Sequence, residues 1–137
     1  MRVLSKVEQR RLSELHPDLQ LISERSRAKQ DFFYVCGGRD EVAQEYAFAI
    51  GTSKVHFPNS KHNKSKNPAY KSDAVDVAPF VNGKIEWKDT TTFYKIYKAF
   101  QESAAELGIK IRSGVDFDMD GNLKNDRWRD LPHHELI

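Results

Sequence analysis

The chain has 137 residues, 39% of them hydrophobic, and carries a formal net charge of +2 at pH 7. This length and composition predict one domain, covering residues 1–137, with enough apolar side chains for a single core. The weak positive charge excludes the strongly basic composition of a nucleic-acid-binding protein. No stretch has the roughly 18 apolar residues of a membrane helix, and the N-terminus turns charged too early for a signal peptide. We therefore expect a monomer that is made and folded in a cytoplasm and does not insert into a membrane.

The first third of the chain predicts two helices and a strand. Residues 5–15 have a ragged apolar stripe typical of a helix, and Pro17 suits the first turn of a second helix that continues to about residue 27. The run 32–36 is apolar and aromatic, which indicates a buried strand, and two glycines end it.

A third helix is predicted from Asp40, which can cap it, to Ile50, with Gly51 as its stop. Its expected core face consists of Ala43, Tyr46, Ala47 and Ile50. Residues 52–72 are polar and rich in Lys, Ser and Asn, which indicates an exposed loop.

The second half predicts more strands around one long helix. Residues 74–78 alternate as a short strand with Asp76 on the side opposite its valines, and Asn82-Gly83 predicts a hairpin turn into 84–87. The best helix runs from Thr90 to Leu107 and ends at Gly108. Its expected core face consists of Phe93, Ile96, Tyr97, Phe100, Ala104 and Leu107. Strands follow at 109–113 and 133–137, so we expect an α+β fold with helices around a small antiparallel sheet.

Two short blocks of ionisable residues point to chemistry. His62 lies at the edge of the polar loop, Asp76 on a strand, and Asp130 three residues before His133. Cys36 is the only cysteine, so a cysteine-rich zinc site is excluded and a metal must use His, Asp and Glu. Two imidazoles and one carboxylate suit a catalytic zinc site, with the other carboxylate handling protons. A single histidine of this kind is usually solvated or bonded in a core, so only the joint pattern carries the prediction.

The joint pattern resembles a known family. That family carries Ser-x-His, then Ala-x-Asp, and finally an acidic residue, two spacers and His-x-Glu-Leu. These motifs stand here as Ser60-Lys61-His62, Ala74-Val75-Asp76 and Asp130-Leu-Pro-His133-His-Glu135-Leu136. Upstream, Gly37-Gly38-Arg39 with Gln44 matches the family's Gly-x-Arg segment and following helix. From about residue 32 onward the chain is similar to zinc peptidases of the D-alanyl-D-alanine carboxypeptidase (VanY-like) type. It is most similar to their phage L-alanyl-D-glutamate endopeptidase branch.

The resemblance implies roles for individual residues. His62, Asp76 and His133 match the zinc ligands, and Asp130 matches the catalytic base. Arg39 matches an arginine that binds the scissile carbonyl or its oxyanion, the alternative being a surface arginine at a helix start. We also expect Ser60 either to hydrogen-bond near the substrate or merely to turn its loop.

Two ambiguities accompany this assignment. The family has a shorter spacing than the fourteen residues between His62 and Asp76, so residues 63–71 form an extra loop: a basic lip over an anionic substrate, or a solvated insertion. Asp73 could be mistaken for the ligand, but Asp76 stands in Ala-x-Asp. His134 neighbours His133, and the His-x-Glu-Leu register selects His133 while His134 points to the opposite face.

The acidic loop before Asp130 resembles half of a calcium site. Its first positions carry oxygen ligands and a glycine in the expected order, but position 12 is Arg127 rather than Glu. Regulatory calcium binding and a solvated Asp-Gly turn are both open. The candidate ligands are Asp116, Asp118, Asp120, Asn122 and Asp126.

The function that the resemblance implies is that of an endolysin. It would cut the L-alanyl-D-glutamate bond of peptidoglycan stem peptides, using zinc, during host-cell lysis. Synthesis in the host cytoplasm and passage through membrane holes would fit a chain with no signal peptide and no separate cell-wall-binding domain. The alternatives are a D,D-carboxypeptidase or dipeptidase on peptidoglycan peptides, and a non-catalytic calcium-dependent wall-binding module.

Overall fold

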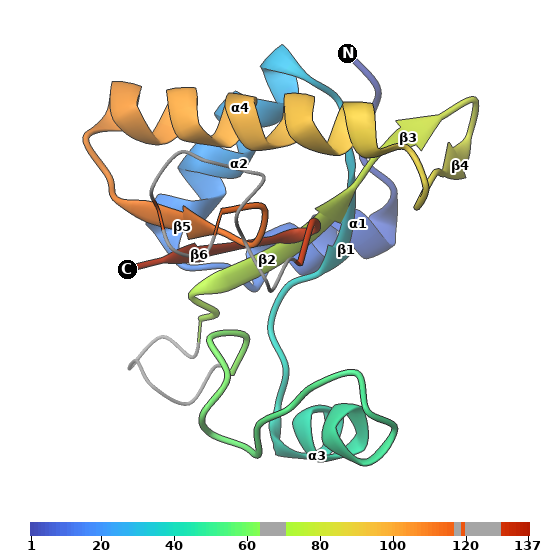
Figure 1. Cartoon of the computed structure of the whole chain (residues 1–137), viewed down its shortest axis with the longest axis vertical. Coiled ribbons are helices and arrows are strands. Elements are labelled where there is room, and N and C mark those ends of the chain that lie inside the picture. The colour runs from blue at the N-terminus through green and yellow to red at the C-terminus, as the bar shows by residue number, and fades with distance from the viewer. Residues whose placement is uncertain (64–70, 117–118, 120–129) are drawn as a thin grey trace.

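A four-stranded antiparallel sheet forms the centre of the computed structural model (Figure 1). The structure describes residues 1–63, 71–116, 119 and 130–137. The strands stand in the order β1-β2-β6-β5, with every neighbouring pair antiparallel. Their bounds are β1 Phe33–Cys36, β2 Ala74–Ala78, β5 Ile111–Ser113 and β6 His133–Leu136. The α+β prediction with a small antiparallel sheet is therefore confirmed.

Helices cover one face of this sheet. They are α2 Pro17–Lys29 and α4 Thr90–Leu107, while α1 Lys6–Ser13 bonds through Glu8 and Arg11 to the free edge of β1 and α3 Glu41–Ala49 lies apart (Figure 1). Side chains of α2 and α4 pack with those of β1, β2 and β5 into the core, which includes Leu19, Tyr34, Val75, Phe100 and Ile111. None of the described helices is long and apolar enough to cross a membrane.

The helix ends follow from local chemistry. Ser5 and Glu8 form a capping box at the start of α1, and Pro17 occupies the first turn of α2. Asp89 caps α4, and Gly108 ends it in the left-handed conformation with φ 68°. These predicted helices begin and end within about two residues of their expected bounds.

The strand alternation divides the sheet into a core face and a site face. In β2, Val75 and Val77 are fully buried against the helices, which turns Asp76 to the opposite face. β6 is paired with β2 so that Asp76 lies across from His133 and Val75 across from His134. The register therefore brings two distant sequence motifs to adjacent positions on the site face.

The Asn82-Gly83 turn is present, with φ of 52° and 78°, but its strands are short. β3 Phe80–Val81 and β4 Lys84–Ile85 form a separate two-stranded sheet rather than extending the central one. The predicted strand at 109–113 likewise begins only at Ile111.

The expected core face of α3 is confirmed only at Ala47 and is wrong at Tyr46 and Ile50. Tyr46 and Ile50 are 66% and 57% exposed, whereas Gln44 and Ala47 are the buried residues of this helix. Figure 1 shows why: α3 stands below the sheet at the end of two connecting segments and does not reach the main core. An apolar stripe predicts a buried face only where another layer covers it.

Candidate active site

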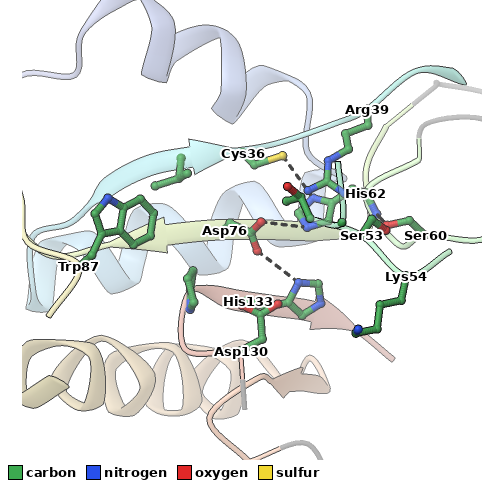
Figure 2. Close-up of a pocket in the computed structure, with 14 residues that line it drawn as sticks. Cys36, Arg39, Ser53, Lys54, Ser60, His62, Asp76, Trp87, Asp130 and His133 are labelled. Atoms are coloured by element: carbon green, nitrogen blue, oxygen red, sulfur yellow. Dashed lines mark hydrogen bonds and ion pairs between the residues drawn. The ribbon is translucent and has the colours of Figure 1, made fainter. Parts of the chain in front are cut away.

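Asp76 lies at the centre of a cluster of ionisable side chains on the site face (Figure 2). Its Oδ2 is 3.3 Å from Nε2 of His62, and its Oδ1 is 3.2 Å from Nδ1 of His133. The two imidazole rings stand edge to face, with centroids 5.3 Å apart. Each carboxylate oxygen thus faces one histidine nitrogen, and three predicted ligands from three chain segments converge.

In each histidine, the ring nitrogen that does not face Asp76 is held by a hydrogen-bond acceptor. Nδ1 of His62 is 2.8 Å from the Gly37 carbonyl oxygen, and Nε2 of His133 is 2.7 Å from Oε1 of Glu135. A carbonyl or carboxylate oxygen can only accept, so these nitrogens carry protons, and without a metal the nitrogens that face the Asp76 carboxylate are donors too. When a ring gives up one proton to bind a metal, the bonds to Gly37 and Glu135 leave its lone pair on the nitrogen that faces Asp76. This is the arrangement in which proteins present histidine to a metal, so the donor set fits a divalent ion such as zinc.

The electrostatics of the cluster favour charge separation in the protein without metal. Burial lowers the pKa of His62, but the adjacent Asp76 carboxylate outweighs this and raises that pKa well above its ordinary value. Burial likewise opposes the raised pKa of His133, which the hydrogen bond to Asp76 favours. The pKa of Asp76 is correspondingly lowered, against its burial, by both histidines. The site is thus built around a carboxylate that stays ionised and attracts positive charge.

Asp130 joins this cluster from the segment before β6. One ligand atom from each of Asp76, Asp130 and His133 lies within 4.8 Å of the others. Burial raises the pKa of Asp130, and the negative charge of Asp76 raises it further. A carboxylate with a raised pKa takes up a proton more readily near neutral pH, which suits a general base.

Gly114 determines where Asp130 sits. The backbone N–H of Asp130 donates to the Gly114 carbonyl at 2.9 Å, and the Gly114 N–H donates to the His133 carbonyl at 2.7 Å. A Cβ on Gly114 would lie only 1.9 Å from the Asp130 carbonyl oxygen. Only glycine therefore permits this close approach.

The cluster opens into a pocket of about 760 Å³. Arg39 and Ser60 line it, as the sequence predicts, together with Lys54 and Trp87, which lie in segments that resemble the family but have no role assigned from the sequence. Ser60 Oγ also accepts the His62 backbone N–H at 3.2 Å, so this serine shapes its loop, while a hydrogen bond from it near the substrate stays a prediction.

Gln44 holds the wall of the pocket that carries Arg39. This buried amide accepts hydrogen bonds from Arg39 Nη1 at 3.3 Å and Asn63 Nδ2 at 3.0 Å. Its Nε2 donates to Ser53 Oγ at 2.8 Å and to the Val55 carbonyl at 2.7 Å. A glutamine in the family motif was visible in the sequence, but its four partners are brought together only by the fold.

Two further residues at the site escaped the sequence reasoning. Cys36 Sγ is 3.8 Å from His62 Nδ1, and Cys36, His62 and Asp76 form a second group with ligand atoms within 4.8 Å of one another. Glu135 stands in the recognised His-x-Glu motif. Its contact with His133 arises because residues two apart on a strand point to the same face of the sheet. The expectation that only His, Asp and Glu are within reach of a metal is therefore too narrow.

The two ambiguous residues of the motifs lie away from the cluster. His134 is fully buried, stacks on Phe100 with centroids 3.9 Å apart, and its Nδ1 is 2.7 Å from Ser113 Oγ. Burial lowers its pKa to about 3, so it is a neutral core residue. Asp73 borders a different pocket, beside Lys61.

The proposed calcium loop falls mostly outside the described residues. Asp116 is described and is 5% exposed. Asp118, Asp120, Asn122 and Asp126 lie outside the described part of the chain, as do residues 64–70 of the extra loop. Calcium binding and the role of the extra loop stay predictions.

Comparison with known proteins first identifies the fold. The structure superposes on the solved L-Ala D-Glu endopeptidase ChiX of Serratia marcescens with a TM-score of 0.76. The match covers 100% of this chain and 90% of that one, at 22% sequence identity. The two proteins share a small α+β fold.

Sequence comparison then identifies the family. Residues 2–137 match the model of the phage L-alanyl-D-glutamate peptidases. The chain is also 34% identical over 137 residues to the L-alanyl-D-glutamate peptidase of Escherichia phage T5, with 96% of each protein covered. The chain belongs to the phage L-alanyl-D-glutamate peptidase family, which confirms the family predicted from the motifs.

Proposed function

We propose that this protein is a zinc-dependent endolysin that hydrolyses the L-alanyl-D-glutamate bond in peptidoglycan stem peptides. Family membership supports the reaction. The observation that carries the metal proposal is the position of Asp76, which faces His62 Nε2 and His133 Nδ1 with separate oxygens. Residues 1–137 would act as one catalytic unit of the wider D-alanyl-D-alanine carboxypeptidase type, reaching the wall from the host cytoplasm.

His62, Asp76 and His133 would hold the metal. A bound zinc ion supplies Lewis acidity, which polarises the scissile carbonyl and makes water a stronger nucleophile at neutral pH. The protein's own contribution is orientation, because Gly37 and Glu135 fix the two rings. Cys36 stands close enough to influence this ligand set.

Asp130 would accept the proton of the attacking water and deliver it to the leaving amine of D-glutamate. Its place in the pocket beside His133 and its raised pKa both support this role. Since one carboxyl group performs both transfers, it must be ionised at the start of each turnover.

Arg39 would stabilise the negative charge that develops on the carbonyl oxygen. Its guanidinium offers positively charged donors in a planar fork and is steadied by Gln44. A donor held in place before the reaction costs no reorganisation in the transition state.

Digestion of purified peptidoglycan, followed by mass spectrometry of the new ends, tests the proposal. New N-terminal D-glutamate is expected, and it should disappear with a chelator and return with zinc. Release of D-alanine would instead indicate a D,D-carboxypeptidase or dipeptidase. Binding to the wall without cleavage, unaffected by Asp130→Ala, would indicate a non-catalytic module.

A further inference from the structure

The proposed substrate has an asymmetric charge, and this inference rests on that proposed function. Glutamate has two carboxyl groups, and the stem peptide continues through only one of them. The other is a free anion a few bonds from the scissile amide, on the leaving-amine side. The L-alanine side has a methyl group and leads back toward the glycan strand, with no comparable charge. An enzyme that recognises this difference in charge between the two sides of the substrate needs a cation at one end of its pocket only.

The pocket has such a difference between its ends. Figure 2 shows Trp87 to one side of Asp76, and Arg39, Ser60 and Lys54 on the other. Trp87 is 53% exposed and offers an indole surface to whatever occupies the pocket. The cationic end and the aromatic end are thus separated by the residues proposed to hold the metal.

Lys54 is an exposed side chain on an anchored backbone. The residues before and after it are both fixed by buried Gln44, whose Nε2 donates to Ser53 Oγ at 2.8 Å and to the Val55 carbonyl at 2.7 Å. The same glutamine accepts a hydrogen bond from Arg39. One buried amide therefore sets the positions of both cations at this end of the pocket.

We propose that Lys54 binds the free carboxylate of the D-glutamate residue, while Trp87 packs against the L-alanine side of the stem peptide. The substrate then lies along the pocket with its leaving amine toward Lys54 and its glycan-linked end toward Trp87. The scissile carbonyl lies between the two ends, beside the residues proposed to hold the metal, where Arg39 reaches it from the Lys54 side. An ammonium suits this task because it is a compact charge with three donors on a flexible stem. Trp87 suits the other end because an aromatic ring packs well against apolar groups and sugar faces.

Two pairs of soluble substrates test the Lys54 end and the Trp87 end of the pocket separately. In the first pair, the D-glutamate carboxylate is free or amidated; in the second, L-alanine is acetylated or joined to a muramyl sugar. Wild-type protein with zinc is expected to prefer the free carboxylate. Lys54→Gln should reduce this preference in kcat/KM by roughly 10- to 100-fold, as expected for a hydrogen bond to a charged group, by slowing only the free-acid substrate. Lys54→Arg should keep most of the preference.

Trp87→Ala should leave the acid-to-amide ratio unchanged and reduce the preference for the muramyl substrate. Lys98→Gln, an exposed lysine on α4, is the matched control and should change neither ratio. Equal losses on both acid and amide substrates in Lys54→Gln would overturn the inference, as would a change of the acid-to-amide ratio in Trp87→Ala. If the wild-type protein with zinc cleaves none of the four substrates, the proposed function itself fails; cleavage with no preference overturns only the subsite.

Discussion

At the scale of single residues, the site depends on which atom of each side chain faces the cluster. The sheet register makes Asp76 and His133 adjacent, and His62 joins them from the loop after α3, but the usefulness of both histidines to a metal depends on proton positions. Gly37 and Glu135 fix those positions by accepting from opposite ring nitrogens, Nδ1 in His62 and Nε2 in His133. The two histidines therefore present different ring nitrogens to Asp76, because the acceptors Gly37 and Glu135 hold the other nitrogen of each ring.

Asp130→Asn tests the base. The amide keeps the size of the side chain but cannot accept a proton, so hydrolysis should fall by about 10²- to 10⁴-fold. Zinc affinity and thermal unfolding should stay close to wild type. Rates from a peptidoglycan digest, with metal content measured on the same samples, check this. A variant that cleaves normally would remove Asp130 from the mechanism.

Glu135→Ala tests the orientation of His133. Without the carboxylate, the Nε2 proton of His133 loses its 2.7 Å acceptor, and Arg112 loses its 2.9 Å bond to Glu135. Zinc affinity should fall by about 10- to 100-fold, the usual effect of removing a carboxylate behind a metal-bound histidine. Glu135→Gln, whose amide oxygen can still accept, should recover part of the loss. Isothermal titration with zinc would contradict the role if affinity were unchanged.

At the scale of elements, α3 is attached to the site through one buried side chain. Gln44 uses both acceptor and both donor positions of its amide, and no other residue type can reproduce that pattern. Helix α3 therefore contributes little to the main core and a great deal to the geometry of the pocket wall.

A double-mutant cycle between Gln44 and Arg39 measures this coupling. Gln44→Glu loses both donors, so kcat/KM should fall by roughly 10-fold, which corresponds to about 1.4 kcal/mol. If Gln44 acts through Arg39, the same change in an Arg39→Ala background should cost much less. Equal costs in both backgrounds would make Gln44 a purely structural residue.

Helix α1 is tied to β1 by a buried carboxylate, Glu8, that should make the protein acid-sensitive. Glu8 is fully buried and accepts from Arg2 at 3.0 Å and from the Tyr34 N–H at 3.2 Å. Burial opposes ionisation, but the hydrogen bonds from Arg2, Ser5 and Tyr34 outweigh it and lower the pKa of Glu8 below its ordinary 4.5. A lowered pKa gives stability that is present above about 4.5 and lost as the pH falls through the folded-state value.

Urea unfolding of wild-type and Glu8→Gln proteins, both with a chelator, tests this. At pH 7 the variant should be less stable by about 1.5–3 kcal/mol, because an amide places donors against donors. The gap between the two proteins should narrow as the pH falls below 4.5, since wild type alone loses the ionised pair. A gap that does not depend on pH would contradict the assignment.

At the scale of the whole molecule, metal binding should stabilise the fold because it links three separate segments. With zinc at about 100 times its dissociation constant, the gain is about 2.7 kcal/mol, or roughly 10 °C in Tm for a chain of this size. The shift should vanish in His62→Ala. It should persist in His56→Ala, whose imidazole pairs with Glu45 outside the cluster. Differential scanning calorimetry with and without zinc measures it, and an unchanged Tm in wild type would count against a metal in this site.

Much of this arrangement could be predicted from the sequence, because it depends on local signals. The cap Asp40, the stop Gly108, the Asn82-Gly83 turn and the alternation around Asp76 predicted a helix start, a helix end, the hairpin and the strand face correctly. Motif spacing identified the residues that the sheet register brings together. Their roles as ligands, base and oxyanion donor stay predictions, because adjacency alone does not establish chemistry.

The remainder depends on tertiary placement. The exposed face of α3 could not be predicted, since amphipathic spacing does not reveal whether a second layer exists. The bonds of Gln44 span residues 39–63, and Cys36 reaches His62 across 26 positions, so no local pattern signals them. Ring tautomers likewise follow from acceptors that only the folded backbone supplies.

The way in which α3 is attached would allow the segment that carries it to be exchanged as a unit in this protein. A backbone hydrogen bond from the Arg39 N–H to the His62 carbonyl, 2.7 Å long, closes the base of the segment (Figure 1). The residues between these two, 40–61, include Gln44 and Lys54 and form one segment that could be exchanged as a unit. Asp76, Asp130 and His133 lie outside this segment. Transplanting residues 40–61 from a relative, with Gln44 kept so that Arg39 stays held, would thus be a way to change which wall chemistry is recognised while Asp76, Asp130 and His133 stay in place.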